Sequence, residues 1–120
     1  MDTKKILVVD DDSANLKLSA DILLRKYEKI FLASNGKEGW WNMTTEENLP
    51  DLVISDVDMP EMGGFELCER IKQIFPDIKV ILMSGYDVRE KALAVGADDF
   101  IRKPFGIAEF YSMVAKLTVE

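Results

Sequence analysis

The stretch DLVISDVDMP, at residues 51–60, joins a short apolar run to a group of acids. An unbroken run such as LVIS is typical of a strand that is buried on both faces of a parallel sheet. Comparable runs occur at residues 6–9, 30–33, 80–83 and 100–101. Stretches with apolar residues at helical spacing separate these runs, and such alternation indicates βαβ units. The pattern therefore predicts five parallel strands, each followed by a helix.

The helical stretches carry their own boundary signals. Ser13 is the expected N-cap of the first helix, in which Ala14, Leu18 and Ile22 recur at i+4. Four more apolar residues follow the same stretch, so this helix is expected to bury more than a narrow stripe; they are Leu16, Leu23, Leu24 and Tyr27. The other helices are predicted around residues 40–43, 65–75, 88–95 and 107–117. Because the chain has no repeat, low-complexity tract or linker, residues 1–120 are expected to form one (βα)₅ domain.

Composition and charge narrow the functional classes. The chain is 48% hydrophobic and 31% charged, an ordinary globular balance, and the single cysteine, Cys68, allows no internal disulfide. It shows no signal-peptide pattern and no apolar stretch near the ~20 residues of a membrane span, so a cytoplasmic location is expected. A net charge of −7 repels phosphate backbones, which argues against nucleic-acid binding. The chain has no histidine, so it has no imidazole base or phosphohistidine of its own.

Residues that can carry chemistry follow the predicted strands. Asp10 and Asp11 come after the first strand, Asp56 after the third, Ser84 after the fourth and Lys103 after the fifth. In an open parallel sheet, ligands bind outside the carboxyl ends of the strands. If the first and third strands are neighbours, the carboxylates converge at that edge.

Converging carboxylates oppose one another's ionisation, and a hard divalent cation resolves the conflict. Mg²⁺ suits the set because it binds one or two carboxylates, keeps waters and shares phosphate oxygens. Lys103 offers a positive charge and Ser84 a hydroxyl donor, and a carboxylate can attack phosphorus to form an acyl phosphate. Taken singly, each residue can equally be a turn, cap or loop residue. Their shared position favours a phosphoryl site.

Several motifs occur together in a fixed order. They are ILVVDDD at 6–12, DLVISDVDMP at 51–60, MSG at 83–85, GADDF at 96–100 and KPF at 103–105. With these motifs the sequence resembles the receiver domains of two-component response regulators over essentially its full length. The resemblance implies a flavodoxin-like (βα)₅ three-layer sandwich with strand order 2-1-3-4-5.

The resemblance also implies a role for each site residue. Asp56 would be the phosphoacceptor, and Asp11 and Asp56 would bind Mg²⁺ together with the backbone carbonyl of Asp58. Asp10 would act on the ion through water. Lys103 would pair with the phosphoryl oxygens, and its bond to the following proline would be cis.

Two further residues would form the switch. Ser84 would move toward the phosphoryl group, and Phe100 would turn inward as it does so. Asp58 and Tyr86 would tune dephosphorylation by shaping water access to the acyl phosphate. Phe100 lacks the hydroxyl of a tyrosine at this position. The glycine pair at residues 63–64 replaces a more usual acid-glycine pair, so this loop is expected to be more mobile.

As a receiver, the chain would be a signalling switch rather than an enzyme. Its partners would be a histidine kinase or phosphotransfer protein and a downstream output domain or protein. The surface of the fourth helix, fifth strand and fifth helix would shift and could form a homodimer. Two alternatives are a Mg²⁺-dependent phosphatase that uses Asp56 and Asp58 as an Asp-x-Asp nucleophile motif, and a degenerate receiver that acts only as an interaction module.

A tryptophan pair stands apart from these motifs. Trp40 is expected to face the core, with Gly39 leaving room for it, and Trp41 to be exposed. An exposed indole can anchor a partner or dimer, although single exposed apolar residues are common.

Overall fold

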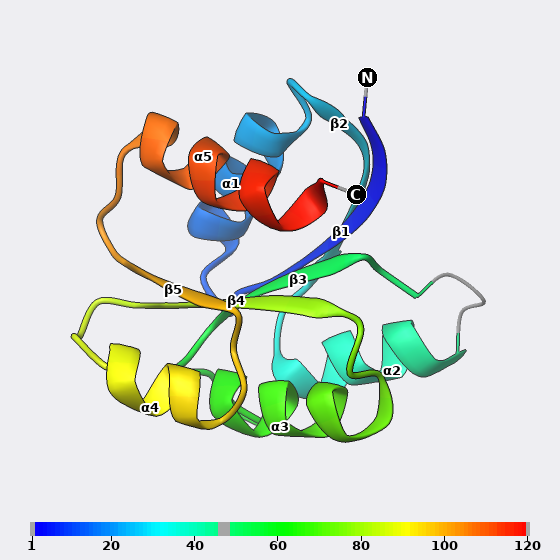
Figure 1. Ribbon diagram of the computed structural model, residues 1–120, viewed down its shortest axis with the longest axis vertical. Helices are drawn as coiled ribbons and strands as arrows, with labels where there is room; N and C mark the ends of the chain where they lie inside the picture. The colour runs from blue at the N-terminus through cyan, green and yellow to red at the C-terminus, as the bar shows by residue number, and fades with distance from the viewer. Residues whose placement is uncertain (1, 46–48, 120) are drawn as a thin grey trace.

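The structure is a computed structural model that describes residues 2–45 and 49–119. Five parallel strands form one sheet in the order β2-β1-β3-β4-β5, which confirms the expected order. Figure 1 shows α1 and α5 on one side of this sheet and α2, α3 and α4 on the other. The three-layer sandwich is therefore confirmed.

Strands and helices alternate through the described residues. They are β1 (Asp2–Val9), α1 (Ser13–Leu23), β2 (Tyr27–Ala33), α2 (Gly36–Thr45), β3 (Leu52–Asp56), α3 (Gly64–Ile74), β4 (Lys79–Ser84), α4 (Arg89–Ala94), β5 (Asp99–Arg102) and α5 (Ile107–Thr118). Within the described residues, no helix is long and apolar enough to cross a membrane.

The central strands need an unbroken apolar run because both faces of the sheet are covered. Successive strand residues point to opposite faces. Ile6 and Val8 accordingly pack into the core under α1 and α5, whereas Leu7 and Val9 pack into the core under α2, α3 and α4. Each fully buried side chain of this kind contributes roughly 1.5–3 kcal/mol.

The first helix differs from the sequence-based expectation at its start and on its apolar face. Asp12, not Ser13, is the N-cap, and its carboxylate accepts hydrogen bonds from the backbone N–H groups of Ala14 and Asn15 at 2.9 and 3.1 Å. Ala14 and Leu18 are exposed. The side of α1 that is buried carries Ser19, Ala20, Ile22 and Leu23. The i, i+4 spacing was correct for a helix, and Ile22 and Leu23 are buried as expected, but Leu24 is exposed, so the core covers less of this helix than its apolar residues span.

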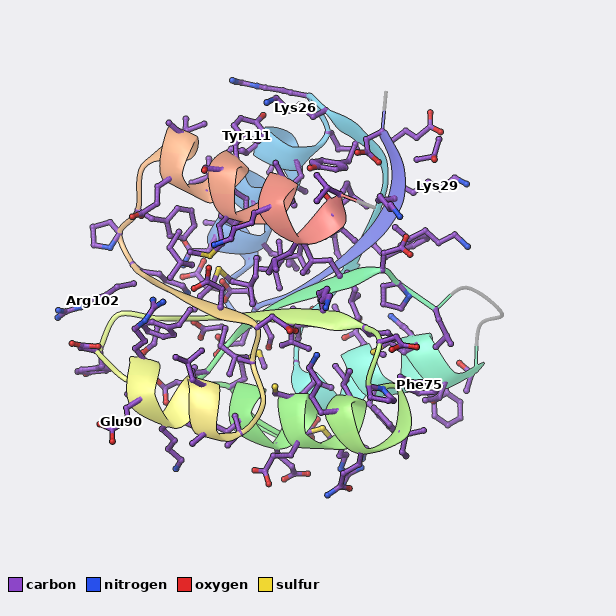
Figure 2. All side chains as sticks on the ribbon, in the orientation of Figure 1. Lys26, Lys29, Phe75, Glu90, Arg102 and Tyr111 are labelled. Atoms are coloured by element: carbon purple, nitrogen blue, oxygen red, sulfur yellow. The ribbon has the colours of Figure 1, made fainter. Side chains whose placement is uncertain are left out.

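Tyr27 begins strand β2 and does not extend the first helix, so that part of the prediction was wrong. Its ring is buried, and its hydroxyl lies 3.1 Å from the hydroxyl of Thr118 in the last turn of α5. A second tyrosine, Tyr111, donates its hydroxyl to the carbonyl of Ile22, and the ammonium of Lys26 lies 4.6 Å from the Tyr111 ring centroid (Figure 2). These contacts hold α5 against α1 and β2.

The tryptophan pair behaves as predicted, except for the role of Gly39. Trp40 is half-buried against the core, with its ring centroid 6.1 Å from that of Phe75, and Trp41 is 66% exposed. A Cβ on Gly39 would lie 3.1 Å from a methyl group of Val9, so this glycine makes room for β1 rather than for Trp40. A partner role for Trp41 stays a prediction.

Cys68 lies in the core, and burial raises the pKa of its thiol to about 11. Because the thiolate is the reactive form, the folded chain should react with a thiol reagent at pH 8 on the order of 100-fold more slowly than the urea-unfolded chain. Following the absorbance of released thionitrobenzoate measures both rates. Equal rates in the two states would contradict this burial.

Candidate functional site

The acidic residues converge because β1 and β3 are neighbours. Val9 of β1 pairs with Ser55 of β3. Asp10 and Asp56 are the residues that follow this pair, so they lie side by side at the ends of the two strands. Asp10, Asp11 and Asp56 present carboxylate oxygens that all lie within 4.8 Å of one another. Asp10 and Asp56 are buried, whereas Asp11 is exposed. The condition that sequence reasoning left open, adjacency of the first and third strands, is met.

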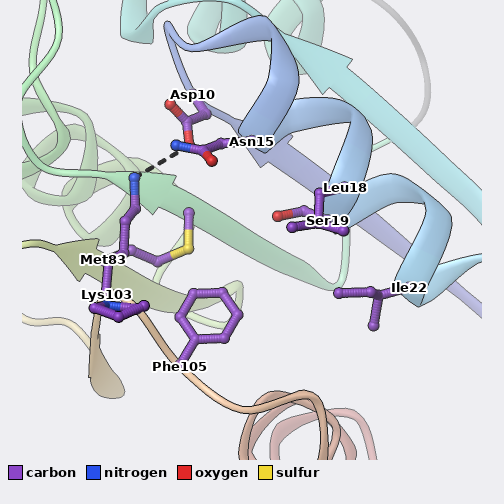
Figure 3. Close-up of a pocket in the computed structure, with 9 residues that line it drawn as sticks. Asp10, Asn15, Leu18, Ser19, Ile22, Met83, Lys103 and Phe105 are labelled. Carbon is purple, nitrogen blue, oxygen red and sulfur yellow. Dashed lines mark hydrogen bonds and ion pairs between the residues drawn. The ribbon is translucent and has the colours of Figure 1, made fainter.

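Lys103 joins this group from the end of β5. Its ammonium lies 2.7 Å from a carboxylate oxygen of Asp56 and 3.3 Å from one of Asp10. Figure 3 shows the Lys103 side chain reaching toward Asp10 from the loop after β5. The bond from Lys103 to Pro104 is cis, as the resemblance implied. One lysine thus faces three carboxylates, and the cluster keeps a net negative charge.

The electrostatics of the cluster follow from burial and from this pairing. Burial raises the pKa of Asp56, hydrogen bonding and attraction to Lys103 lower it, and repulsion from Asp10 and Asp11 raises it again, with a net upward shift. Burial lowers the pKa of Lys103, but its bonds to Asp56 and Asp10 outweigh burial and leave that pKa raised. The lysine therefore stays charged, and Asp56 resists ionisation without a further cation.

The donor set fits a hard divalent cation. Mg²⁺ prefers oxygen ligands and retains several waters. The exposed Asp11 carboxylate leaves space for those waters, while one oxygen of Asp10 already accepts the backbone N–H of Asp12 at 3.0 Å. Asp58 lies exposed in the turn after β3.

Ser84 ends β4 beside the cluster. Its side chain is buried, and its hydroxyl accepts the backbone N–H of Tyr86 at 3.0 Å. Its carbonyl accepts the backbone N–H of Lys103 at 2.8 Å, which ties the loops after β4 and β5 together. The Tyr86 side chain is 72% exposed. In this structure the Ser84 hydroxyl is therefore bonded within its own loop.

Phe100 lies inside the core on β5. This strand is the neighbour of β4, which ends at Ser84. The guanidinium of Arg89 donates to the Phe100 carbonyl and to the Asp99 carboxylate, both at 3.2 Å. Arg89 thus joins α4 to β5. Sequence reasoning missed it, because a charged residue on a short helix has no pattern that separates a tertiary bond from a solvated side chain.

The glycine pair after the acceptor permits a close backbone approach. A Cβ on Gly64 would lie 2.3 Å from the carbonyl oxygen of Asp56, and one on Gly63 would lie 2.8 Å from that of Val57. The Gly64 N–H donates to the Val57 carbonyl at 2.9 Å. The absence of side chains here is therefore required by packing, and greater mobility of this loop stays a prediction.

Comparison with known proteins agrees with this geometry. Residues 6–115 match the family model of the response regulator receiver domain. Sporulation initiation phosphotransferase F of Bacillus subtilis is 34% identical over 97% of this chain and 94% of its own length. A solved receiver domain from Methanospirillum hungatei is 32% identical, covers 97% of this chain and 94% of its own, and superposes with a TM-score of 0.86.

The chain belongs to the family of response regulator receiver domains, the signalling modules of two-component systems. Other relatives are much longer proteins. The chain spans 13% of a cyclic-nucleotide phosphodiesterase of Dictyostelium discoideum and 47% of a transcriptional regulator of alkaline phosphatase synthesis from Bacillus subtilis.

Proposed function

We propose that Asp56 accepts a phosphoryl group from a phosphohistidine of a sensor kinase or phosphotransfer protein. The observation that carries this proposal is the Lys103 ammonium, which pairs with Asp56 and Asp10 at an edge where three carboxylates meet. This edge of the sheet therefore combines a nucleophile, a fixed cation and a set of possible metal ligands. Phosphoryl transfer needs mainly such positioning and charge neutralisation.

In the proposed reaction, a carboxylate oxygen of Asp56 forms a bond to phosphorus as the phosphorus–nitrogen bond of the phosphohistidine breaks. The electron pair leaves with the imidazole, which takes up a proton. Mg²⁺, when bound, neutralises charge on the phosphoryl oxygens. Asp11, Asp56 and the backbone carbonyl of Asp58 would hold it, with Asp10 acting through water.

Phosphorylation of Asp56 would change the conformation of a surface away from the site through Lys103, Ser84 and Phe100. The acyl phosphate adds about 1.5–2 negative charges beside Lys103. Lys103 would pair with a phosphoryl oxygen, and the Ser84 hydroxyl would exchange the Tyr86 N–H for the phosphoryl group. Phe100 was expected to turn inward as Ser84 moves, but its side chain is already buried while the Ser84 hydroxyl is still bonded to Tyr86. Phe100 would therefore keep its inward position, and the surface of α4, β5 and α5 would shift toward a partner or a second copy.

Residues 1–120 would act as one receiver unit, in keeping with receiver domains being signalling switches rather than classical enzymes. Its partners would be the phosphodonor and a downstream output domain or protein. The acidic chain itself would bind no nucleic acid.

Intact-mass measurement after incubation with acetyl phosphate tests the proposal. We expect the mass of one added phosphoryl group with Mg²⁺, none with EDTA, and none in Asp56→Asn. Absence of an adduct in the wild-type chain with Mg²⁺ would overturn the proposal in favour of an interaction module. Repeated turnover of phosphomonoesters would instead favour the Asp-x-Asp phosphatase.

Tyr86 is expected to slow hydrolysis of the acyl phosphate. Its exposed ring follows Ser84 by two residues and can restrict the path of water to phosphorus. Tyr86→Ala should shorten the lifetime of phospho-Asp56 roughly 2–5-fold, a barrier change of about 0.5–1 kcal/mol. Mass spectrometry after removal of the donor measures the lifetime, with Leu93→Ala on α4 as an exposed control. An unchanged lifetime in Tyr86→Ala would remove this role.

A further inference from the structure

The connection between β4 and α4 is tied to β5 by two arginines. Arg102, the last residue of β5, donates through Nε to the Gly85 carbonyl at 3.3 Å. Arg89, the first residue of α4, donates to the carbonyl of Phe100 and to the carboxylate of Asp99, both at 3.2 Å. Figure 1 shows this connection on the same side of the molecule as the end of β5, where Figure 2 labels Arg102. The connection is thus held to β5 at both of its ends.

The acceptors of Arg89 are better fixed than those of an ordinary exposed ion pair. The Asp99 side chain is only 18% exposed, and the oxygen that accepts Arg89 also accepts the backbone N–H of Phe100 at 2.8 Å. Exposed pairs usually contribute little, partly because two long side chains have to be ordered. Here the carboxylate and the carbonyl are already held by β5, so only the arginine has to be ordered, and it forms two hydrogen bonds at once.

The helix that Arg89 begins has few other means of staying in place. It is six residues long, its buried residue is the small Ala92, and its N-cap position is occupied by Val88, whose side chain has no atom that can accept a hydrogen bond. So short a helix depends on tertiary contacts. A second charged contact, from the Lys91 ammonium to the Phe65 ring centroid at 4.6 Å, goes to α3. The position of α4 relative to β5 therefore depends strongly on Arg89.

A change at the phosphoryl site reaches α4 through this same connection. The Ser84 hydroxyl accepts the Tyr86 N–H at 3.0 Å, and in the proposed function it turns to the phosphoryl group instead. The Tyr86 N–H is then released, which frees one end of the connection to move. Because Phe100 is already buried, the movement that remains lies in the connection and in α4, and the Arg89 bonds oppose it.

We infer that Arg89 is a restraint that sets the balance between two positions of α4. While Arg89 is bonded to β5, α4 keeps the position of the unphosphorylated chain, and the shifted position requires Arg89 to leave Asp99 and the Phe100 carbonyl. The inference rests on the proposed function for the direction of its effect. Removing a contact that is made in one position favours the other, so loss of Arg89 should make Asp56 easier to phosphorylate.

Hydrogen–deuterium exchange of the unphosphorylated chain, measured by mass spectrometry of its peptides, tests the restraint itself. Arg89→Met keeps an unbranched side chain and removes the guanidinium. We expect the amides of residues 86–95 to exchange about 3–10-fold faster than in wild type, while those of α1 stay unchanged. Arg89→Lys keeps the charge but loses the two-pronged geometry, and it should lie between the two. Arg70→Met, which breaks an exposed pair with Glu66 within α3, is the matched control and should leave the exchange of α4 unchanged.

Intact-mass time courses with acetyl phosphate and Mg²⁺ test the link to Asp56. We expect Arg89→Met to take up the phosphoryl group about 2–5-fold faster than wild type and Arg70→Met. Loss of a contact with a purely structural role would not speed this reaction. Unchanged exchange of α4 in Arg89→Met overturns the restraint, and faster exchange with a wild-type rate of uptake overturns its part in the switch. If the wild-type chain takes up no phosphoryl group, the proposed function fails instead, and the exchange comparison still decides whether Arg89 holds α4.

Discussion

Lys103→Met is expected to slow phosphoryl transfer to Asp56 by about 10²–10³-fold, the usual cost of removing one preorganised charge donor from a transition state. Lys103 is the cation that pairs with both Asp56 and Asp10. Methionine keeps an unbranched side chain against the loop. The decrease in rate can therefore be assigned to removal of the positive charge. The rate is measured by intact mass over time with acetyl phosphate and Mg²⁺.

Lys116→Met, at an exposed lysine in the last turn of α5, is the matched control and should phosphorylate at the wild-type rate. If Lys103→Met accumulates phospho-Asp56 as fast as this control does, Mg²⁺ alone neutralises the transferring group and the role of Lys103 is structural.

The same variant should also change how stability depends on pH. The folded-state pKa of Asp56 is raised, so its protonated form stabilises the fold at low pH, and this contribution is lost as pH rises through the folded pKa. Removing Lys103 raises that pKa further. Without Mg²⁺, Lys103→Met should therefore lose more free energy of unfolding than wild type between about pH 4, the ordinary pKa of an aspartate, and pH 8. Urea unfolding at the two pH values measures this difference, and equal losses would contradict it.

Gly64→Ala is expected to lower the free energy of unfolding by about 2–4 kcal/mol, near the top of the range for overpacking. The added Cβ would lie 2.3 Å from the Asp56 carbonyl oxygen and 3.0 Å from the Cα of Val57. Both are backbone atoms at the end of a central strand, so neither can move without displacing the acceptor. Helix propensity favours alanine over glycine here and so opposes the expected effect.

Gly85→Ala provides the control for this substitution. A Cβ at Gly85 meets no atom within 4 Å, and its change in stability should stay within about 0.5 kcal/mol. Urea unfolding of the three chains measures the difference. If Gly64→Ala is as stable as Gly85→Ala, the loop after β3 yields to the methyl group, and the predicted mobility of this loop would gain support.

Much of the fold followed from short-range patterns. The run at residues 52–55 could belong to a buried strand or to part of a buried helix on periodicity alone, and its short length and β-branched residues favoured the strand that the structure contains. The helix predicted over residues 65–75 is α3, where Cys68 and Ile71 are buried but Ile74 is exposed. The stripe of α1 could not be assigned in the same way, because its apolar residues surround more of the helix than the core covers.

The sequence by itself determined which residues stand at the carboxyl ends of the strands, since strand and helix periods are local properties of the chain. Only the tertiary structure decided that β1 lies beside β3, that Lys103 bridges Asp56 and Asp10, and that Arg89 ties α4 to β5. Strand order, ion pairing across 47 or 93 residues of chain, and the side of a helix that is covered all depend on contacts between distant segments. Those contacts form only when the sheet assembles and the helices pack on its two faces.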